Sequence, residues 1–175
     1  MRDDFSSYRQ VGEQRFRETT GFYFEDFEVG DVFEHRPGRT ITEVDNIWQS
    51  LLCLNPHPLH IDAAYARKTE FKQPLISSLV TLAIVGGMSL QSTSAKGIAN
   101  LGWDKIRLTA PVFVGDTLYA ESEVLSARLS QSRPNQGIVT VETRGLKEDG
   151  TVFLTYQRSF LVPCRGHGPQ EQADY

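Results

Sequence analysis

The sequence predicts an α+β fold in which an antiparallel β-sheet wraps around one long central helix. Apolar residues recur at helical spacing from Thr42 to about residue 97 and alternate with polar residues after it. The segment 73–94 is apolar around most of its circumference, so we expect the helix that it forms to be buried. A helix of this kind, followed by a run of strands, needs the sheet as its cover, which gives the α+β architecture.

The composition is typical of one soluble globular domain. The chain has 175 residues, of which 39% are hydrophobic and 23% are charged, so it is long enough to bury a core of its own. Both ends are polar and lack periodicity. We therefore expect a flexible N-terminal arm over residues 1–20, one folded domain over residues 21–163 and a flexible C-terminal tail over residues 164–175.

A strand and a capped helix come first. Residues 21–42 are rich in aromatic residues and predict a lead-in segment followed by one strand. Thr42, with Asp45 three residues later, is a near-match to a capping box and predicts the start of a helix. Pro56 and Pro58 are expected to end this helix and to prevent an early restart. Five apolar residues at helical spacing support the helix: Val44, Ile47, Trp48, Leu51 and Leu52.

A short element, the central helix and four strands complete the fold. Residues 60–71 are polar and predict a short helix or a turn before the central helix. Residues 100–130 and 137–163 alternate between apolar and polar side chains, which predicts four antiparallel strands. The tripeptide Glu-Asp-Gly at 148–150 is a strong hairpin signal between the last two of them.

Charge and cysteine content exclude several classes of protein. A net charge of −4 argues against a nucleic-acid or membrane-surface binder, although a few local cations can still hold an anionic ligand. Cys53 and Cys164 lie far apart, which fits a reducing compartment better than a disulfide framework or a metal site. The N-terminus lacks the apolar stretch of a secretory signal, and the apolar segment 79–90 is too short to span a bilayer. We therefore expect a cytoplasmic protein with no nucleic-acid or membrane partner.

Several motifs occur together in an order that points to a known family. They are Arg-Thr-Ile-Thr-Glu-Val-Asp at 39–45, His-Pro-Leu-His-Ile-Asp at 57–62 and the strand segment 100–118. Over residues 22–162 the chain resembles the MaoC-like (R)-specific enoyl-CoA hydratases and dehydratases. The resemblance implies a single hotdog fold, an acyl-CoA thioester substrate, and no metal or cofactor other than the CoA of the substrate. It also implies a homodimer or a higher homo-oligomer that binds acyl-CoA near the shared interface.

The turn Leu-Asn-Pro-His-Pro-Leu-His at 54–60 is the segment in which the resemblance places the catalytic residues. The usual family turn is Asp-x-Asn-Pro-x-His, so His60 matches the catalytic histidine, Asn55 replaces the aspartate and His57 replaces the asparagine. In this the chain resembles a branch of the family that acts on mesaconyl-, methylmalyl- or itaconyl-CoA. The resemblance therefore implies that the chain adds or removes water at the double bond of a short, branched, dicarboxylic enoyl-CoA.

The three polar residues of this turn suit different tasks. His60 is the candidate for proton transfer, because an imidazole has an ordinary pKa of about 6.5 and can act as acid or base near neutral pH. Asn55 cannot take a proton, but its amide can position water; the alternative is an ordinary helix-end asparagine. His57 is a second base, a protonated group that holds a distal substrate carboxylate, or only a residue that orders the turn. Of the three, the carboxylate role is slightly favoured, which makes His57 a candidate substrate-binding residue.

Other candidate substrate-binding residues lie outside the turn. Ser77 and Ser78 begin the central helix, where free backbone amides would bind the thioester oxygen, although both also suit ordinary capping. Arg39 and Arg107, together with Lys105, are candidate contacts for the phosphates of CoA, with a solvated surface role as the alternative. Two further features favour structural roles over functional ones: Asp62 as an N-cap rather than a partner of His60, and Gly86 with Gly87 as packing positions rather than an acyl slot.

Two other functions compete with the hydratase hypothesis. A hotdog thioesterase usually needs a carboxylate on or near the central helix, but residues 79–94 contain no Asp or Glu. A non-catalytic acyl-CoA-binding protein would explain the loss of the aspartate at position 55. Against this non-catalytic alternative, His60 and the sequence pattern around it are retained.

Overall fold

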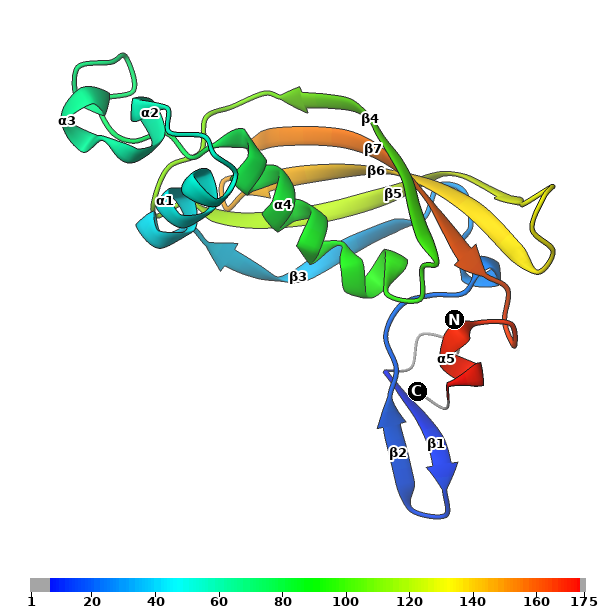
Figure 1. Ribbon diagram of the computed structural model, residues 1–175. Coiled ribbons are helices and arrows are strands. Elements are labelled where there is room, and N and C mark those ends of the chain that lie inside the picture. Colours follow the sequence, from blue (N-terminus) through cyan, green and yellow to red (C-terminus); the bar gives the residue numbers. More distant parts are fainter. Residues whose placement is uncertain (1–6, 174–175) are drawn as a thin grey trace.

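The computed structural model describes residues 7–173 and has the predicted α+β architecture (Figure 1). Five antiparallel strands form the main sheet in the order β3-β5-β6-β7-β4, and β1 pairs with β2 in a separate sheet. The strands are β1 Tyr8–Gly12, β2 Arg15–Glu18, β3 Val32–Thr40, β4 Ala99–Leu108, β5 Thr117–Leu129, β6 Gln136–Lys147 and β7 Val152–Pro163. The helices are a 3-10 turn Phe24–Asp26, α1 Glu43–Leu52, α2 Pro58–Ile61, α3 Ala63–Ala66, α4 Ser78–Met88, a π-helix Leu90–Ser94 and α5 Pro169–Gln172.

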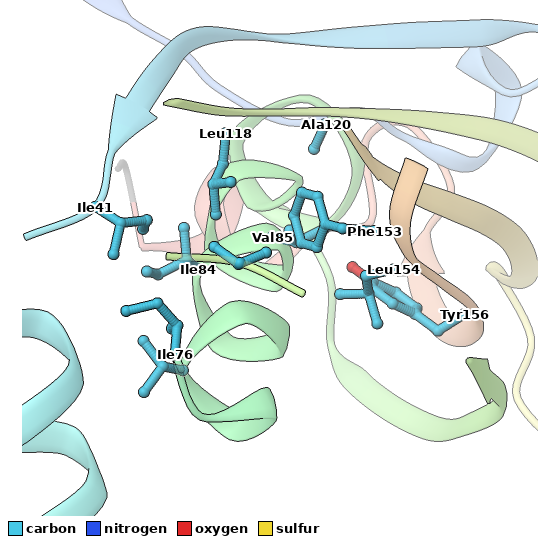
Figure 2. Packing of buried hydrophobic residues seen from close by; sticks show 11 residues of the cluster. Ile41, Ile76, Ile84, Val85, Leu118, Ala120, Phe153, Leu154 and Tyr156 are labelled. Atoms are coloured by element: carbon cyan, nitrogen blue, oxygen red, sulfur yellow. The ribbon is translucent and has the colours of Figure 1, made fainter. Parts of the chain in front are cut away.

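The central helix α4 lies across one face of the sheet, and α1, α2 and α3 gather near its N-terminal end (Figure 1). Figure 2 shows Ile84 and Val85 of α4 beside Leu118 of β5 and Phe153 of β7. Each of these side chains is buried. Full burial of such a side chain contributes about 1.5–3 kcal/mol, so this layer fixes α4 on the sheet.

The prediction that the central helix is buried all round is wrong for the single chain. Its inner face is buried, but Leu79 is 49% exposed and Leu90, just beyond its end, is 50% exposed. The helix also starts at Ser78 rather than near residue 73. The physical reason is that one sheet can cover only one side of a helix, so the outer apolar side has no cover within the described residues.

Helix α1 begins where the sequence predicts, but its faces are reversed relative to a simple amphipathic helix. The carboxylate of Asp45 accepts hydrogen bonds from the backbone N–H and the hydroxyl of Thr42, at 2.9 and 2.7 Å. Apolar Val44 and Trp48 are 70% and 73% exposed, whereas Asn46 is buried. The side of α1 that faces the rest of the molecule is therefore polar.

The expectation that the prolines prevent an early restart of helix is also wrong. Helix α2 begins at Pro58, with His57 as its N-cap residue. Proline is well tolerated at the first helical position, because its missing N–H would have no partner there and its φ angle is already helical. Asp62 then caps α3, as predicted, by accepting from the amides of Ala64 and Tyr65.

The two ends carry short elements of regular structure. The β1–β2 hairpin precedes a segment that Lys96 anchors, because its Nζ donates to the hydroxyl of Thr19 and to the carbonyls of Thr20 and Gly21 at 2.7–3.0 Å. Helix α5 lies in the C-terminal tail. That the arm and the tail are flexible stays a prediction.

Strand β4 is an edge strand with an irregular register. Its pairing with β7 shifts between Asp104 and Arg107, and Lys105 between them has a left-handed φ of 51°. Such a bulge reverses the alternation of side chains. As a result, apolar residues before and after it can share one face, and all of them are at least 37% exposed: Leu101, Trp103, Ile106 and Leu108.

A buried polar network lies beneath the C-terminal end of α4, and it predicts a pH-dependent stability. The ring of His35 contacts Ser92 Oγ through Nδ1 at 2.7 Å and Ser122 Oγ through Nε2 at 2.8 Å. Burial, together with the nearby charge of Arg158, lowers the pKa of His35 from 6.5 to about 4. Well above pH 6.5 the ring is neutral in both the folded and the unfolded chain. Below that pH the unfolded chain takes up a proton that the folded chain cannot, so the free energy of unfolding falls.

We expect this free energy to decrease by about 2–3 kcal/mol between pH 7 and pH 4.5 on account of His35 alone. Urea unfolding of the wild type and of His35→Gln at both pH values measures this, because glutamine does not titrate. The variant should lose less stability than the wild type over that interval. Equal losses in the two proteins would show that His35 titrates normally.

Candidate active site

His60 is held in one orientation with one ring nitrogen free. Its Nδ1 lies 2.8 Å from the carbonyl oxygen of Leu75. A carbonyl oxygen can only accept, so Nδ1 carries the proton in the neutral ring and Nε2 keeps an unshared pair. The half-buried imidazole lines a cavity. This arrangement suits a general base, because the free nitrogen needs no change of tautomer to accept a proton.

Asn46, which the sequence analysis did not single out, connects the segments around His60. Its Nδ2 donates to the carbonyls of His60 and Leu75 at 2.8 and 3.1 Å, and its Oδ1 accepts from the amide of Ser77 at 2.9 Å. One buried side chain thus joins α1, α2 and the entry to α4. The only signal in the sequence is a polar residue close to the predicted apolar stripe, which is too common to identify it.

The two serines at the start of α4 differ in what they can offer. The amide of Ser77 is already bound to Asn46, and Ser77 is buried, so its N–H does not reach a ligand. Among the described residues, the amides of Ser78 and Leu79 make no hydrogen bond. Ser78 lines the same cavity as His60. Free amides at a helix N-terminus favour negative charge, so the amides of Ser78 and Leu79, and not that of Ser77, are available to an anionic group; the oxyanion contact itself stays a prediction.

The cavity has a volume of about 370 Å³. Its walls are largely apolar, and His60, Ser78, Thr81 and Thr109 supply the polar groups. A small apolar pocket with a few convergent polar groups is the usual form of a small-molecule site. Sequence reasoning missed most of its lining because those residues come from separate segments: Phe71, Leu75, Ile76, Leu108, Ala110, Pro111, Val112 and Phe153.

Asn55 and His57 lie in the turn but do not line this cavity. The Oδ1 of Asn55 accepts a long hydrogen bond of 3.4 Å from the amide of His57. The Nδ1 of His57 accepts from the amide of Leu59 at 3.2 Å, which leaves Nε2 for any ligand. The rings of His57 and His60 are near one another, with centroids 5.8 Å apart. Both residues thus order the turn, and their roles toward a substrate stay predictions.

The cationic candidates differ in availability. Arg39 forms an ion pair with Asp45 of α1, so its charge is already engaged. Arg107 is exposed and donates from Nη1 to the carbonyl of Ile106 at 2.9 Å. It adjoins Leu108 and Thr109, which line the cavity, so Arg107 is better placed than Arg39 to meet a ligand there.

Gly86 and Gly87 of α4 differ in the space around them. A Cβ on Gly86 would lie 3.1 Å from the ring of Trp103, so the predicted packing role is confirmed at this position. A Cβ on Gly87 would meet nothing within 4 Å, so its role stays open.

Residues 7–173 contain no cluster of three or more histidine, cysteine, aspartate or glutamate residues placed to bind a metal ion. Within the same part of the chain, every helix is too short or too polar to cross a membrane.

Comparisons with known proteins agree with the motifs. A family profile described as mesaconyl-CoA hydratase matches residues 3–172. The chain is 34% identical over 146 residues to the mesaconyl-CoA hydratase of Haloarcula marismortui, and 33% identical over 145 residues to the beta-methylmalyl-CoA dehydratase of Chloroflexus aurantiacus. Each match covers 83% of this chain and 41% of the relative. A solved structure from Mycobacterium tuberculosis, described as a double hotdog fold, superposes with a TM-score of 0.77 at 24% identity, over 83% of this chain and 45% of that one.

The chain thus spans about two fifths of the length of these curated relatives. The structural match confirms the expected hotdog fold, with α4 as its central helix. The profile match extends over nearly the whole chain, including the turn at 54–60 and the start of α4. The chain belongs to the mesaconyl-CoA hydratase family.

Proposed function

We propose that the chain is a hydro-lyase that adds water to, or removes it from, the α,β double bond of a short, branched, dicarboxylic enoyl-CoA of the mesaconyl-CoA type. The observation that carries this proposal is the orientation of His60. Its Nδ1–H is bound to Leu75, so a free Nε2 borders an apolar cavity beside the unbonded amides of α4. The mesaconyl-CoA hydratase and beta-methylmalyl-CoA dehydratase relatives support the substrate class.

The proposed reaction uses one base and one anion-binding group. The Nε2 of His60 takes a proton from water while the water oxygen bonds to Cβ. The electron pair of the double bond moves toward the thioester, and the carbonyl oxygen becomes enolate-like as it accepts hydrogen bonds from the amides of Ser78 and Leu79. His60 then returns its proton to Cα, which restores the neutral imidazole. Dehydration is the reverse sequence, and neither direction needs a cofactor beyond the CoA of the substrate.

The remaining parts of the proposal concern assembly and location. A second copy of the chain is the proposed cover for the exposed apolar side of α4 and the open edge of β4, because long apolar edges otherwise promote uncontrolled association. Cys53 and Cys164 are both free, which supports a reducing cytoplasm.

The thioesterase alternative has weaker support. It needs a carboxylate to direct water at the thioester carbonyl, and no carboxylate lines the cavity among the described residues. The alternative of a non-catalytic binding protein requires that His60 does not act as a base, although its ring lines the cavity and its Nε2 is free to accept a proton.

One assay separates the three functions. Crotonyl-, mesaconyl- and itaconyl-CoA are incubated with the protein while enoyl absorbance and free thiol are followed. Loss of absorbance without thiol supports hydration, and release of thiol supports the thioesterase. Binding without either change supports the non-catalytic protein and contradicts the proposal.

Replacing Asn55 by aspartate tests whether the amide only positions water. We expect Asn55→Asp to keep or raise the rate on crotonyl-CoA, because a carboxylate can accept a hydrogen bond from water and also take its proton. Initial rates on crotonyl-CoA check this, with the melting temperature as a control for folding. A loss of more than about tenfold in a folded variant would show that the Nδ2–H₂ group is itself required.

A further inference from the structure

Arg158 of β7 is a buried cation without a carboxylate partner. The residue is 5% exposed, and no carboxylate within residues 7–173 lies within ion-pair distance of it. Taking a charge out of water costs several kcal/mol unless another group compensates it. The nearby His35 gives no compensation, because the charge of Arg158 helps to keep that ring neutral.

The contacts that Arg158 does make leave part of its hydrogen-bonding capacity unused. Its Nη2 donates to Thr93 Oγ1 at 2.8 Å and to Ser94 Oγ at 3.1 Å, while its Nε is buried and makes no hydrogen bond. The guanidinium carbon lies over the rings of Trp103 and Phe160, 5.6 and 5.1 Å from their centroids. Rings against its faces stabilise the cation but accept no hydrogen bond in the plane of the guanidinium, so Nε–H and the two Nη1–H groups have no acceptor among the described residues.

Arg158 also lines a cavity. The space has a volume of about 240 Å³, and Leu90, Ser94, Asn100 and Phe160 contribute to its walls. Thr93 and Ser94 belong to the π-helix Leu90–Ser94, and short π-helical segments occur often at functional sites. A buried guanidinium held by two hydroxyls and bordering a cavity has the composition of an anion-binding site.

We propose that this cavity is a carboxylate-binding site in which Arg158 is the charged ligand-binding residue and Ser94 and Asn100 supply polar contacts. A carboxylate fits better than a larger phosphate ester, because a single guanidinium supplies the positive charge and the walls are otherwise apolar or neutral. The carboxylate comes either from a free dicarboxylate or from the distal end of a dicarboxylic acyl-CoA. The second source rests on the proposed function.

The two sources make different geometric demands. Helix α4 is about 16 Å long and separates this cavity from that of His60, so a five-carbon acyl group held at His60 does not reach Arg158 of the same chain. Strand β4, however, carries Asn100 near one end and Leu108, from the His60 cavity, at the other. If β4 pairs antiparallel with β4 of a second copy, Arg158 of one copy approaches the His60 cavity of the other.

The test compares wild type, Arg158→Gln and the control Arg144→Gln, which changes an arginine at the surface. In the first arm, methylsuccinate is added in a thermal-unfolding assay, with its uncharged diamide as the control. In the second arm, KM is measured for mesaconyl-CoA and crotonyl-CoA. If Arg158→Gln does not fold, Arg158→Lys replaces it, because lysine keeps the charge but loses the planar array of donors.

Binding of a free dicarboxylate predicts that methylsuccinate, and not its uncharged diamide, raises the melting temperature of wild type and Arg144→Gln, and that Arg158→Gln loses this shift. Binding of the acyl group predicts that Arg158→Gln raises KM at least tenfold for mesaconyl-CoA and leaves crotonyl-CoA unchanged. If neither effect occurs, the carboxylate site does not exist. If the wild type hydrates no CoA ester, the proposed function fails, and the methylsuccinate arm alone decides on Arg158.

Discussion

The variant His60→Ala is expected to lose the proposed hydratase activity by about 10³-fold, because general acid–base catalysis by a positioned side chain contributes about 10²–10⁴ in rate. His60 supplies the one basic nitrogen among the polar side chains that line the 370 Å³ cavity within the described residues, where the others are hydroxyls. Alanine leaves the amides of Ser78 and Leu79 in place, so binding of the thioester should persist. The effect should therefore appear in kcat, with a small change in KM for mesaconyl-CoA.

Stability must be separated from catalysis in this experiment. Removal of the ring breaks the hydrogen bond to Leu75, which costs about 1 kcal/mol, so the variant should fold with a modestly lower melting temperature. His167→Ala is a matched control, because His167 is an exposed imidazole in the C-terminal tail. A folded His60→Ala protein with wild-type kcat would assign the base to another residue.

How far the sequence predicts this fold depends on whether the information is local. Thr42 and Asp45 are three residues apart and interact within one turn, so the start of α1 follows from the sequence. The α+β order and the four C-terminal strands follow from hydrophobic periodicity in the same way. Local patterns also suggest that a helix turns its apolar side inward. In α1 the reverse holds: Trp48 is exposed and Asn46 is buried, because the inward side must hydrogen-bond to backbone groups of other segments.

In the candidate site, too, local features follow from the sequence, whereas features that depend on distant residues do not. The family resemblance of the turn at 54–60 points to His60, but the orientation of its ring depends on Leu75, fifteen residues away. Ser77 and Ser78 are neighbours in sequence, yet one amide is used by Asn46 and the other is free, which only the tertiary contact reveals. Arg39 has the right charge for a CoA phosphate, but its pairing with Asp45 crosses from β3 to α1. The sequence does not identify Arg158 as a candidate site residue, because the alternation in β7 predicts an inward side chain but does not indicate which groups that side chain contacts.

Asn46→Ala should be the most destabilising substitution near the site, lowering the free energy of unfolding by about 4 kcal/mol. It leaves the His60 carbonyl and the Ser77 amide without their partner, while the Leu75 carbonyl keeps the hydrogen bond from His60 Nδ1, and each unsatisfied buried group costs about 1–3 kcal/mol. Ser50→Ala is the matched control, because Ser50 is buried on the same helix and its hydroxyl has no hydrogen-bond partner. That control should be neutral or slightly stabilising in urea unfolding.

Asn46 is a positioning residue, so its loss should also change catalysis in the fraction that still folds. The carbonyls of His60 and Leu75 and the amide of Ser77 would no longer share one anchor, which allows the base to move relative to the amides at the start of α4. A displacement of about 1 Å between catalytic groups is enough to cost about 10²-fold in rate. At a temperature where Asn46→Ala is folded, kcat for mesaconyl-CoA should therefore fall while KM changes little. A variant that is destabilised but has wild-type kcat would show that Asn46 holds the fold together without setting the geometry of the site.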